Sequence, residues 1–132
     1  MGPMNMEYDA SWSLDKKKEG LEKPFCCLNA RARDFAKLGR LYLKNGNWDG
    51  KQLVPASWVK ESTKIDTTQG GAWSYQYQGW FPSRNGDFMA QGILGQYVYM
   101  NPAKNLPIVR LGKDYGNVNW PNVFTRLVGR YY

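Results

Sequence analysis

The feature that most constrains the fold is a β-type run over residues 88–111. Two extended stretches, 93–100 and 106–111, are rich in β-branched and aromatic side chains. The stretch between them, 101–105, contains two Asn and one Pro, which are turn-forming residues. The pattern predicts a β-hairpin at the centre of the domain.

Two glycines at the start of the first predicted strand, Gly92 and Gly95, make residues 90–96 the candidate functional surface. Interior glycine weakens a strand unless another backbone or a ligand must come close. A β-bulge or a tight packing contact explains the same glycines without any function. The residues alone leave both interpretations open.

The composition is that of one globular domain over residues 1–132. Hydrophobic residues make up 42% of the chain and charged residues 22%, which argues against a disordered protein. No stretch approaches the length of a membrane span, and the first residues lack the cationic-then-apolar pattern of a signal peptide. The residues leave the cellular location unknown.

The net charge of +7 favours anionic partners, but the only basic run is 16–18, so we expect no nucleic-acid partner. The aromatic share is high, with 6 Trp and 9 Tyr. Such rings either fill the core, which is the expected role, or line a groove. A stand-alone glycan- or peptide-binding module is therefore the alternative function, built from six rings of the predicted sheet: Trp73, Tyr75, Tyr77, Trp80, Tyr97 and Tyr99.

The two cysteines, Cys26 and Cys27, are adjacent. A disulfide between neighbours in the sequence is strained and rare, so the pair does not predict an oxidised framework. The 132 residues contain no His, which excludes a Ser-His-Asp triad or a Cys–His metal site made within them. We expect no metal and no cofactor.

Helical periodicity predicts three helices, over 30–45, over 56–62, and from Trp120 to near the end of the chain. Asn29 is the expected N-cap of the first helix, because its side-chain oxygen can accept from a free N–H of the first turn. Gly46 is the expected left-handed C-cap.

A further strand is predicted over 72–81, where aromatic and polar residues alternate. Together with the hairpin it gives an α+β fold, a three-stranded antiparallel meander packed with helices. Such a sheet has two open edges, and nothing in the sequence covers either of them. We therefore expect an incomplete sheet that associates with another polypeptide through an open edge.

Three stretches of the chain together resemble one family. They are EYDASWSLD at 7–15, FCCLNARARDFAKLGRLYLKNGNWDGKQLVPASWVKES at 25–62, and QGILGQYVYMNPAKNLPIVRLGK at 91–113. In this order they resemble class C β-lactamase-like serine hydrolases, a family that includes penicillin-binding proteins, esterases and amide hydrolases. The resemblance implies a bacterial, often exported enzyme that acts by acyl transfer on a small-molecule ester or amide or on a peptidoglycan-like substrate.

The resemblance also implies roles for individual residues. The family carries Lys-Thr-Gly or a variant on a strand beside the site, and residues 90–92 occupy that position here. The family places a backbone N–H of this strand in the oxyanion hole, which carries over to Ile93. Ala90 stands where the family has a cation, so we do not expect recognition of a substrate carboxylate. The expected substrate-binding residues are Ala90, Gln91, Gly92, Gly95 and Gln96.

The family's nucleophile motif, Ser-x-x-Lys, and its Tyr-x-Asn motif both precede the site strand. Matching strings begin at Ser13, Ser57 and Tyr115, but such short patterns arise by chance, and Tyr115 follows the strand it should precede. The sequence therefore predicts the C-terminal portion of a β-lactamase-like domain. Its N-terminal strands and nucleophile region are missing, so we expect the chain to be inactive alone.

Overall fold

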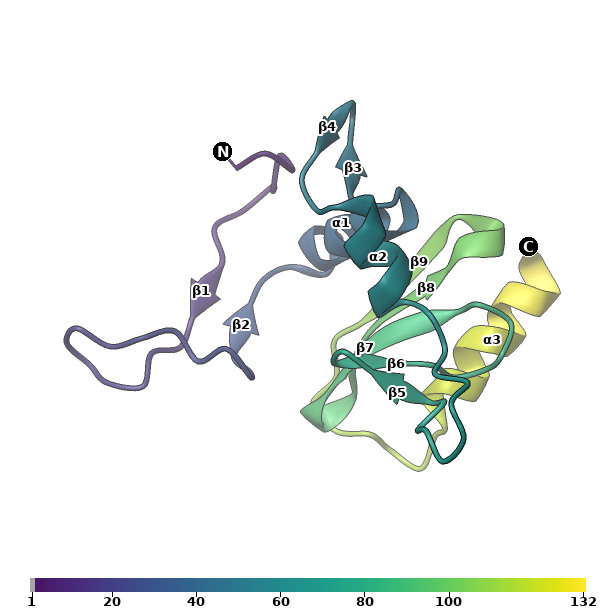
Figure 1. Cartoon of the computed structure of the whole chain (residues 1–132). Coiled ribbons are helices and arrows are strands. Elements are labelled where there is room, and N and C mark those ends of the chain that lie inside the picture. Colours follow the sequence, from purple (N-terminus) through teal and green to yellow (C-terminus); the bar gives the residue numbers. More distant parts are fainter. Residues whose placement is uncertain (1) are drawn as a thin grey trace.

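The structure, a computed structural model, describes residues 2–132. A body built around a five-stranded antiparallel sheet carries an N-terminal arm that extends away from it (Figure 1). The strands of the sheet lie in chain order: β5 (Tyr75–Gln76), β6 (Gly79–Trp80), β7 (Phe88–Gly92), β8 (Gln96–Asn101) and β9 (Leu106–Arg110). Helices and an antiparallel meander are both present, so the predicted α+β class is confirmed.

The predicted hairpin is formed by β8 and β9, in a register that places Tyr99 opposite Ile108. Between the strands lies a one-turn 3₁₀ helix, Pro102–Lys104. The side chain of Asn101 accepts from the N–H of Lys104 at 3.0 Å, and Asn105 closes the turn with a φ of 49°. The turn residues therefore act as their sequence predicts.

The sheet has five strands, so the prediction of three is wrong in number. Where one strand over 72–81 was expected, the chain turns back on itself between β5 and β6. Tyr77 and Gln78 have φ values of 47° and 65°. Two consecutive left-handed residues form the tight turn that suits the twist of a hairpin. Tyr75 then faces Trp80 across the pair, with ring centroids 4.7 Å apart.

Helices cover both faces of the sheet (Figure 1). They are α1 (Ala32–Leu43), α2 (Ala56–Ser62) and α3 (Trp120–Tyr131). Side chains of β8 alternate between the two faces. Tyr97 and Tyr99 pack with Phe124 of α3, whereas Met100 packs with Phe88 on the side of α1. The core is therefore two layers of apolar side chains, one on each side of the sheet.

The three predicted helices are confirmed, with a correction at each end of α1. Its N-cap is Arg31, with no side-chain hydrogen bond, and the predicted cap Asn29 lies in a strand of the arm instead. Pairing with Ser11 takes the backbone of Asn29 away from the helix.

At the other end of α1 the helix is capped by Lys44, and the left-handed residue directly after it is Asn45, with a φ of 52°, rather than the predicted Gly46. Gly46 follows, also left-handed with a φ of 78°, and donates to the carbonyl of Leu41 at 2.8 Å, the bond that completes a Schellman motif.

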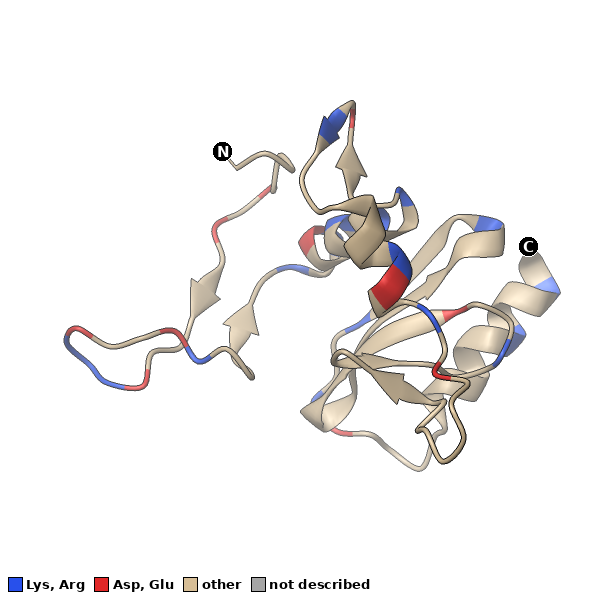
Figure 2. Ribbon diagram, viewed as in Figure 1, with Lys and Arg blue, Asp and Glu red and all other residues tan. Residues whose placement is uncertain are grey.

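The N-terminal arm is a ribbon in which β1 (Ser11–Trp12) pairs with β2 (Leu28–Asn29). The indole N–H of Trp12 donates to the carbonyl oxygens of Lys23 and Cys26, at 2.9 and 3.0 Å, and ties the loop between the strands. Positively and negatively charged residues lie next to one another around the tip of this loop (Figure 2). A second small hairpin, β3 (Asn47–Trp48) with β4 (Lys51–Gln52), joins α1 to α2.

The structure joins Cys26 and Cys27 in a disulfide, which contradicts the expectation from their adjacency. The backbone bends sharply at this point. Cys26 donates from its N–H to the carbonyl of Lys23 at 3.3 Å, and Cys27 has a φ of 75°. A left-handed residue at the bend lets neighbouring side chains meet, a geometry that composition alone does not reveal.

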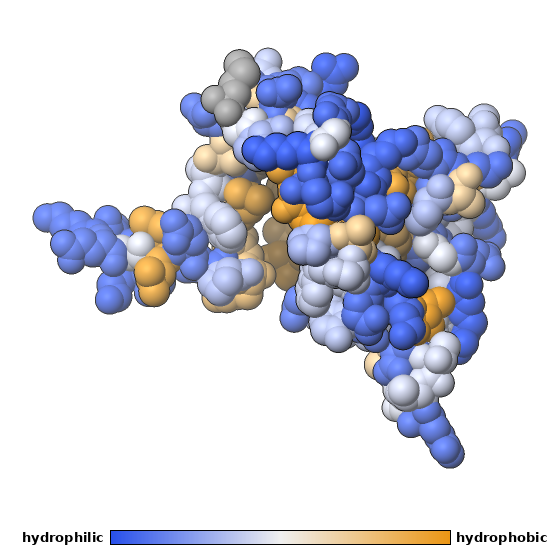
Figure 3. Space-filling view, turned by 45° about the horizontal axis from the view of Figure 1, so that its top comes forward, coloured by the Kyte–Doolittle hydropathy of each residue, from blue (hydrophilic) through white to orange (hydrophobic). Residues whose placement is uncertain are grey.

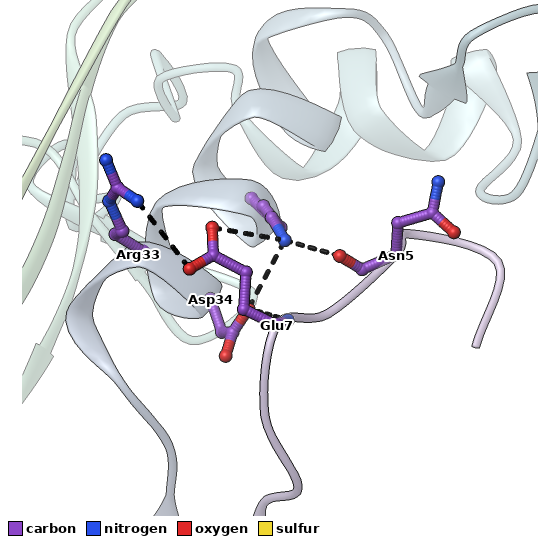
Figure 4. A network of polar contacts seen from close by, with 5 residues as sticks. Asn5, Glu7, Arg33 and Asp34 are labelled. Atoms are coloured by element: carbon purple, nitrogen blue, oxygen red, sulfur yellow. Dashed lines mark hydrogen bonds and ion pairs between the residues drawn. The ribbon is translucent and has the colours of Figure 1, made fainter. Parts of the chain in front are cut away.

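A polar network anchors the arm to the first turn of α1 (Figure 4). Oδ1 of the buried Asp34 accepts from the backbone N–H of Glu7 at 2.8 Å and lies 3.5 Å from Nζ of Lys37. The N–H of Glu7 lowers the pKa of Asp34; burial opposes this effect and Lys37 adds to it. The carboxylate of Glu7 lies 3.7 Å from both Arg33 and Lys37.

Among residues 2–132, no helix is long and apolar enough to cross a bilayer. The same residues contain no group of three or more Cys, Asp or Glu side chains placed to hold a metal ion.

Candidate active site

The candidate surface, residues 90–96, lies where β7 runs beyond its neighbour β6. The two strands pair only at Trp80 and Met89. On its other side β7 stays paired with β8 as far as Gly92, opposite Gln96. Ala90, Gln91 and Gly92 are all exposed. The end of β7 is therefore a strand that is fixed on one side and open on the other.

A tight turn, Ile93–Gly95, follows β7, so the predicted strand over 93–100 begins three residues later, at Gln96. Leu94 and Gly95 have φ values of 61° and 77°. Gly95 is required by this conformation and by space, because a Cβ there would lie 2.7 Å from the carbonyl oxygen of Asp114. A Cβ on Gly92 would lie 3.2 Å from Cβ of Gln96, so this glycine serves close packing across the strand pair.

The N–H of Ile93 is unpaired. Ile93 is the first residue of the one-turn helix, so its N–H has no acceptor within that turn. None of the turn and loop hydrogen bonds of the described residues uses it. The residue is 76% exposed. A backbone donor without an acceptor therefore lies at the end of β7, in the exposed residue that the sequence singled out.

The side chain of Gln96 points to the loop after β9 rather than to solvent. Its Nε2 donates to the carbonyl of Gly112 at 2.5 Å, and its Oε1 accepts from the N–H of Gly112 at 3.1 Å. Both ends of the amide are thus engaged. The structure brings Ala90, Gln91 and Gly92 together as an exposed strand, whereas Gln96 supports the turn behind them.

Two residues that sequence reasoning did not single out, Arg110 and Trp120, hold this turn. The guanidinium of Arg110 donates to the carbonyls of Gly95 and Asp114, at 2.5 and 3.2 Å. It also stacks on the ring of Trp120, 3.9 Å from the ring centroid. The register of β8 with β9, which pairs Arg110 with Tyr97, places Arg110 beside the start of β8, and the predicted hairpin is the signal in the sequence from which that neighbourhood follows.

Tyr115 also lies at the candidate surface. Its hydroxyl donates to the carbonyl of Gly92 at 3.4 Å, a long hydrogen bond, and its own carbonyl accepts from the indole of Trp120 at 2.8 Å. This is the tyrosine of the chance-level Tyr-x-Asn string. Its place beside β7 comes from the path of the loop after β9.

The two Ser-x-x-Lys strings do not assemble into a nucleophile pair. Ser57 is exposed on α2, and Ser13 is exposed in the arm. Within the described part of the chain, no side-chain hydrogen bond links Ser57 to Lys60 or Ser13 to Lys16, although 31 such bonds involve other pairs.

The predicted aromatic groove is divided by the sheet. Tyr97 and Tyr99 are core residues, 4% and 0% exposed, so they are unable to meet a ligand. The exposed ring of Tyr77 instead stacks edge-on against Trp58 of α2, with centroids 5.2 Å apart. What remains outside is a small aromatic patch around the β5–β6 hairpin.

A recess of about 460 Å³ lies elsewhere, between α1, α2 and β7. Its walls include Tyr42, Val59 and Phe88, and it contains none of residues 90–96. Apolar surface also gathers where the arm meets the body (Figure 3). The candidate donor therefore lies on an open strand end, outside this recess.

A comparison with solved structures finds a protein described as "Putative 6-aminohexanoate-dimer hydrolase from Bacillus anthracis". The two chains are 31% identical, the match covers 96% of this chain, and the TM-score is 0.79. This chain is similar to a serine hydrolase of the β-lactamase-like family. This similarity confirms, at the level of the general family only, the resemblance seen in the sequence.

The hydrolase likeness covers a part of the relative only. The chain spans 34% of the length of the Bacillus anthracis protein. No protein-family model and no curated protein matches the chain.

Proposed function

We propose that this chain supplies one wall of an acyl-transfer site in a serine hydrolase that cleaves an amide or an ester. The observation that carries the proposal is the N–H of Ile93, which is unpaired and belongs to an exposed residue at the open end of β7. An oxyanion donor must be in place before the reaction and free of other acceptors, because only then does it stabilise developing charge without reorganisation.

The strand before this donor supports a substrate-binding role. Ala90, Gln91 and Gly92 present an exposed strand with no neighbour on one side, along which an extended substrate can lie. Gly92 has no side chain to obstruct a close approach. Because Ala90 carries no charge, the proposed substrate does not depend on a carboxylate at this position.

The substrate class we propose is a linear amide. The similar structure is described as acting on a dimer of 6-aminohexanoate, which is joined by a linear amide bond. An open strand end without a cation suits such a substrate better than a charged bicyclic lactam.

We further propose that the nucleophilic serine and its lysine lie outside these 132 residues. The chain then corresponds to the C-terminal portion of the parent domain and is inactive alone. Support comes from the two Ser-x-x-Lys strings, since Ser13 and Ser57 are exposed and unconnected to the lysines that follow them.

The first experiment treats the 132-residue chain with an active-serine phosphonate probe and measures its mass. We expect no covalent adduct. Stoichiometric labelling of any serine contradicts the claim that the nucleophile lies elsewhere.

The second experiment restores the remainder of the enzyme. This chain replaces the matching region of the Bacillus anthracis hydrolase, and the hybrid is assayed on the linear 6-aminohexanoate dimer. We expect hydrolysis, with the amine released measured by chromatography. A folded hybrid that leaves the dimer intact contradicts the proposed function.

A glycan- or peptide-binding role is a second, weaker proposal. It rests on the exposed rings of Trp58, Tyr77 and Trp80 around the β5–β6 hairpin. Tryptophan fluorescence is titrated with peptidoglycan fragments, and an unchanged spectrum at millimolar ligand removes this proposal.

A further inference from the structure

The peptide group between Gly92 and Ile93 has two polar ends that move together. Its N–H is the proposed oxyanion donor, and its C=O accepts from the hydroxyl of Tyr115 at 3.4 Å. Because the peptide is planar, rotating the carbonyl rotates the N–H by the same angle. Whatever fixes the carbonyl therefore fixes the direction of the donor.

Tyr115 is held in place through Trp120 and Arg110. The indole N–H of Trp120, the first residue of α3, donates to the carbonyl of Tyr115 at 2.8 Å. The guanidinium of Arg110 donates to the neighbouring carbonyl of Asp114 at 3.2 Å and stacks on the Trp120 ring at 3.9 Å. A stacked guanidinium with fixed donors is a rigid support.

The same guanidinium holds the other side of the turn, since it donates to the carbonyl of Gly95 at 2.5 Å. Around the guanidinium, the backbone of the Ile93–Gly95 turn packs directly against the backbone of the loop after β9. A Cβ on Gly95 would lie 2.7 Å from the Asp114 oxygen, and a Cβ on Gly112 would lie 2.7 Å from the Leu94 oxygen. Both positions therefore have room for glycine only.

We propose that Tyr115, supported by Arg110 and Trp120, is a positioning residue that orients and polarises the Gly92–Ile93 peptide. The Tyr115 hydroxyl acts on the carbonyl and thereby on the N–H of the same group. A hydrogen bond accepted at one end of a peptide strengthens the donor at the other end, by roughly 10–30% in condensed-phase estimates. This inference rests on the proposed function only for the use of that N–H.

The decisive experiment compares Tyr115→Phe with Tyr131→Phe by NMR on the 132-residue chain. Both tyrosines are partly exposed, at 43% and 64%, so loss of the hydroxyl is compatible with folding. In Tyr115→Phe we expect the carbonyl ¹³C of Gly92 and the amide ¹⁵N of Ile93 to shift upfield, because both lose the polarising bond. In Tyr131→Phe both stay at the wild-type values.

Equal shifts of Gly92 and Ile93 in the two variants overturn the proposal. A second variant, Arg110→Lys, tests the support of Tyr115. It keeps the positive charge but loses the paired donors and the planar stack. We expect the same two nuclei to move, together with the carbonyl of Gly95, with the circular dichroism of the sheet and helices retained. Unmoved Gly92 and Ile93 signals in this variant contradict the role assigned to Arg110.

These spectra need no substrate, so they test the positioning role of Tyr115 independently of the proposed function. If the signals move but the hybrid enzyme keeps its rate without the Ile93 donor, the proposed function falls and the positioning role stands. In the active hybrid, Tyr115→Phe should lower kcat and leave KM close to its starting value. The fall in kcat should be smaller than the roughly 10²-fold loss that follows removal of a whole oxyanion donor.

Discussion

Tyr99 is the most deeply buried large side chain of the protein, at 0% exposed. Its hydroxyl donates to Oδ2 of Asp87 at 2.9 Å, and Asp87 also accepts from the hydroxyl of Ser83. Burial raises the pKa of Tyr99 to about 12; Asn101 acts in the opposite direction, and the negative Asp87 adds to the rise. The pair ties the loop before β7 to the middle of the sheet.

Replacing Tyr99 with Phe leaves Asp87 buried without one donor. Below pH 10 we expect the variant to lose about 1–3 kcal/mol of unfolding free energy. The folded pKa of Tyr99 lies above the unfolded one, so its contribution is complete below pH 10 and is lost as the pH rises toward 12. The gap between the wild type and Tyr99→Phe should narrow over that range.

Denaturant unfolding of both proteins at several pH values measures this gap. Tyr97, whose pKa is also raised by burial, is present in both proteins and cancels. A gap that stays constant between pH 10 and pH 12 contradicts the assignment.

Whether the sequence predicts the role of a single residue depends on how far along the chain its interactions reach. Asn101 acts within a few residues, and the sequence predicts its role in the turn. Gly46 also acts locally, but it lies one residue beyond the left-handed cap Asn45. Asn29 is suited to a helix cap, but its long-range pairing with Ser11 places it in a strand of the arm instead. The bond between Tyr99 and Asp87 joins a strand to a loop, so alternation predicts the burial of Tyr99 but not its partner.

The packing of α1 on the sheet depends on Gly39, which is buried within the helix. A Cβ there would lie 3.1 Å from Cβ of Pro107 and 3.3 Å from Cγ1 of Val98. Helix-interior glycine costs about 0.5–1 kcal/mol relative to alanine, so a glycine kept here indicates close approach of helix and strand.

Gly129 of α3 is a matched control, because it is exposed and a Cβ there would meet nothing within 4 Å. We expect Gly129→Ala to raise the unfolding free energy by about 0.5–1 kcal/mol. Gly39→Ala should gain less, because the same helical benefit is offset by the contacts with β8 and β9. Thermal or denaturant unfolding of both variants measures the difference, and an equal gain shows that α1 does not need the glycine.

At the level of elements, the strongly periodic segments are predictable. The helices α1, α2 and α3 and the hairpin of β8 with β9 follow from spacing and turn residues. The β5–β6 hairpin is not predictable in this way, because alternating aromatic and polar residues are equally compatible with one long strand and with two short strands joined by a turn. Its turn is made by Tyr77 and Gln78, which are not typical turn formers, and their left-handed φ values have no sequence signal.

At the scale of the whole molecule, two groups of apolar side chains are largely exposed, one in the arm and one at the end of β7. In the arm, Leu21 and Phe25 are 73% and 82% exposed. Beside the open end of β7, Ile93 and Leu94 are also largely uncovered. The sheet ends at β9, which pairs with β8 alone. These surfaces support the proposal that another part of a hydrolase completes the fold around this chain.

The candidate site is predictable in part. Glycine spacing and the family resemblance select residues 90–96, and the structure places an unpaired N–H at Ile93. The supports at Arg110 and Tyr115 contact the turn from 15 and 23 residues away in the sequence. No local sequence pattern predicts contacts over such a distance, because they depend on the path of the loop after β9.

The most direct test of the central claim removes the Ile93 donor in the hybrid enzyme. Proline suits this site, because Gly92 before it is extended, with a ψ of 168°, and the N–H that proline lacks has no acceptor here. Ile93→Pro deletes the N–H, and Ile93→Val keeps it. We predict that kcat for the linear amide falls by about 10²–10³-fold in Ile93→Pro, with KM little changed, and stays near the parent value in Ile93→Val. An Ile93→Pro hybrid that is folded and as fast as Ile93→Val contradicts the account.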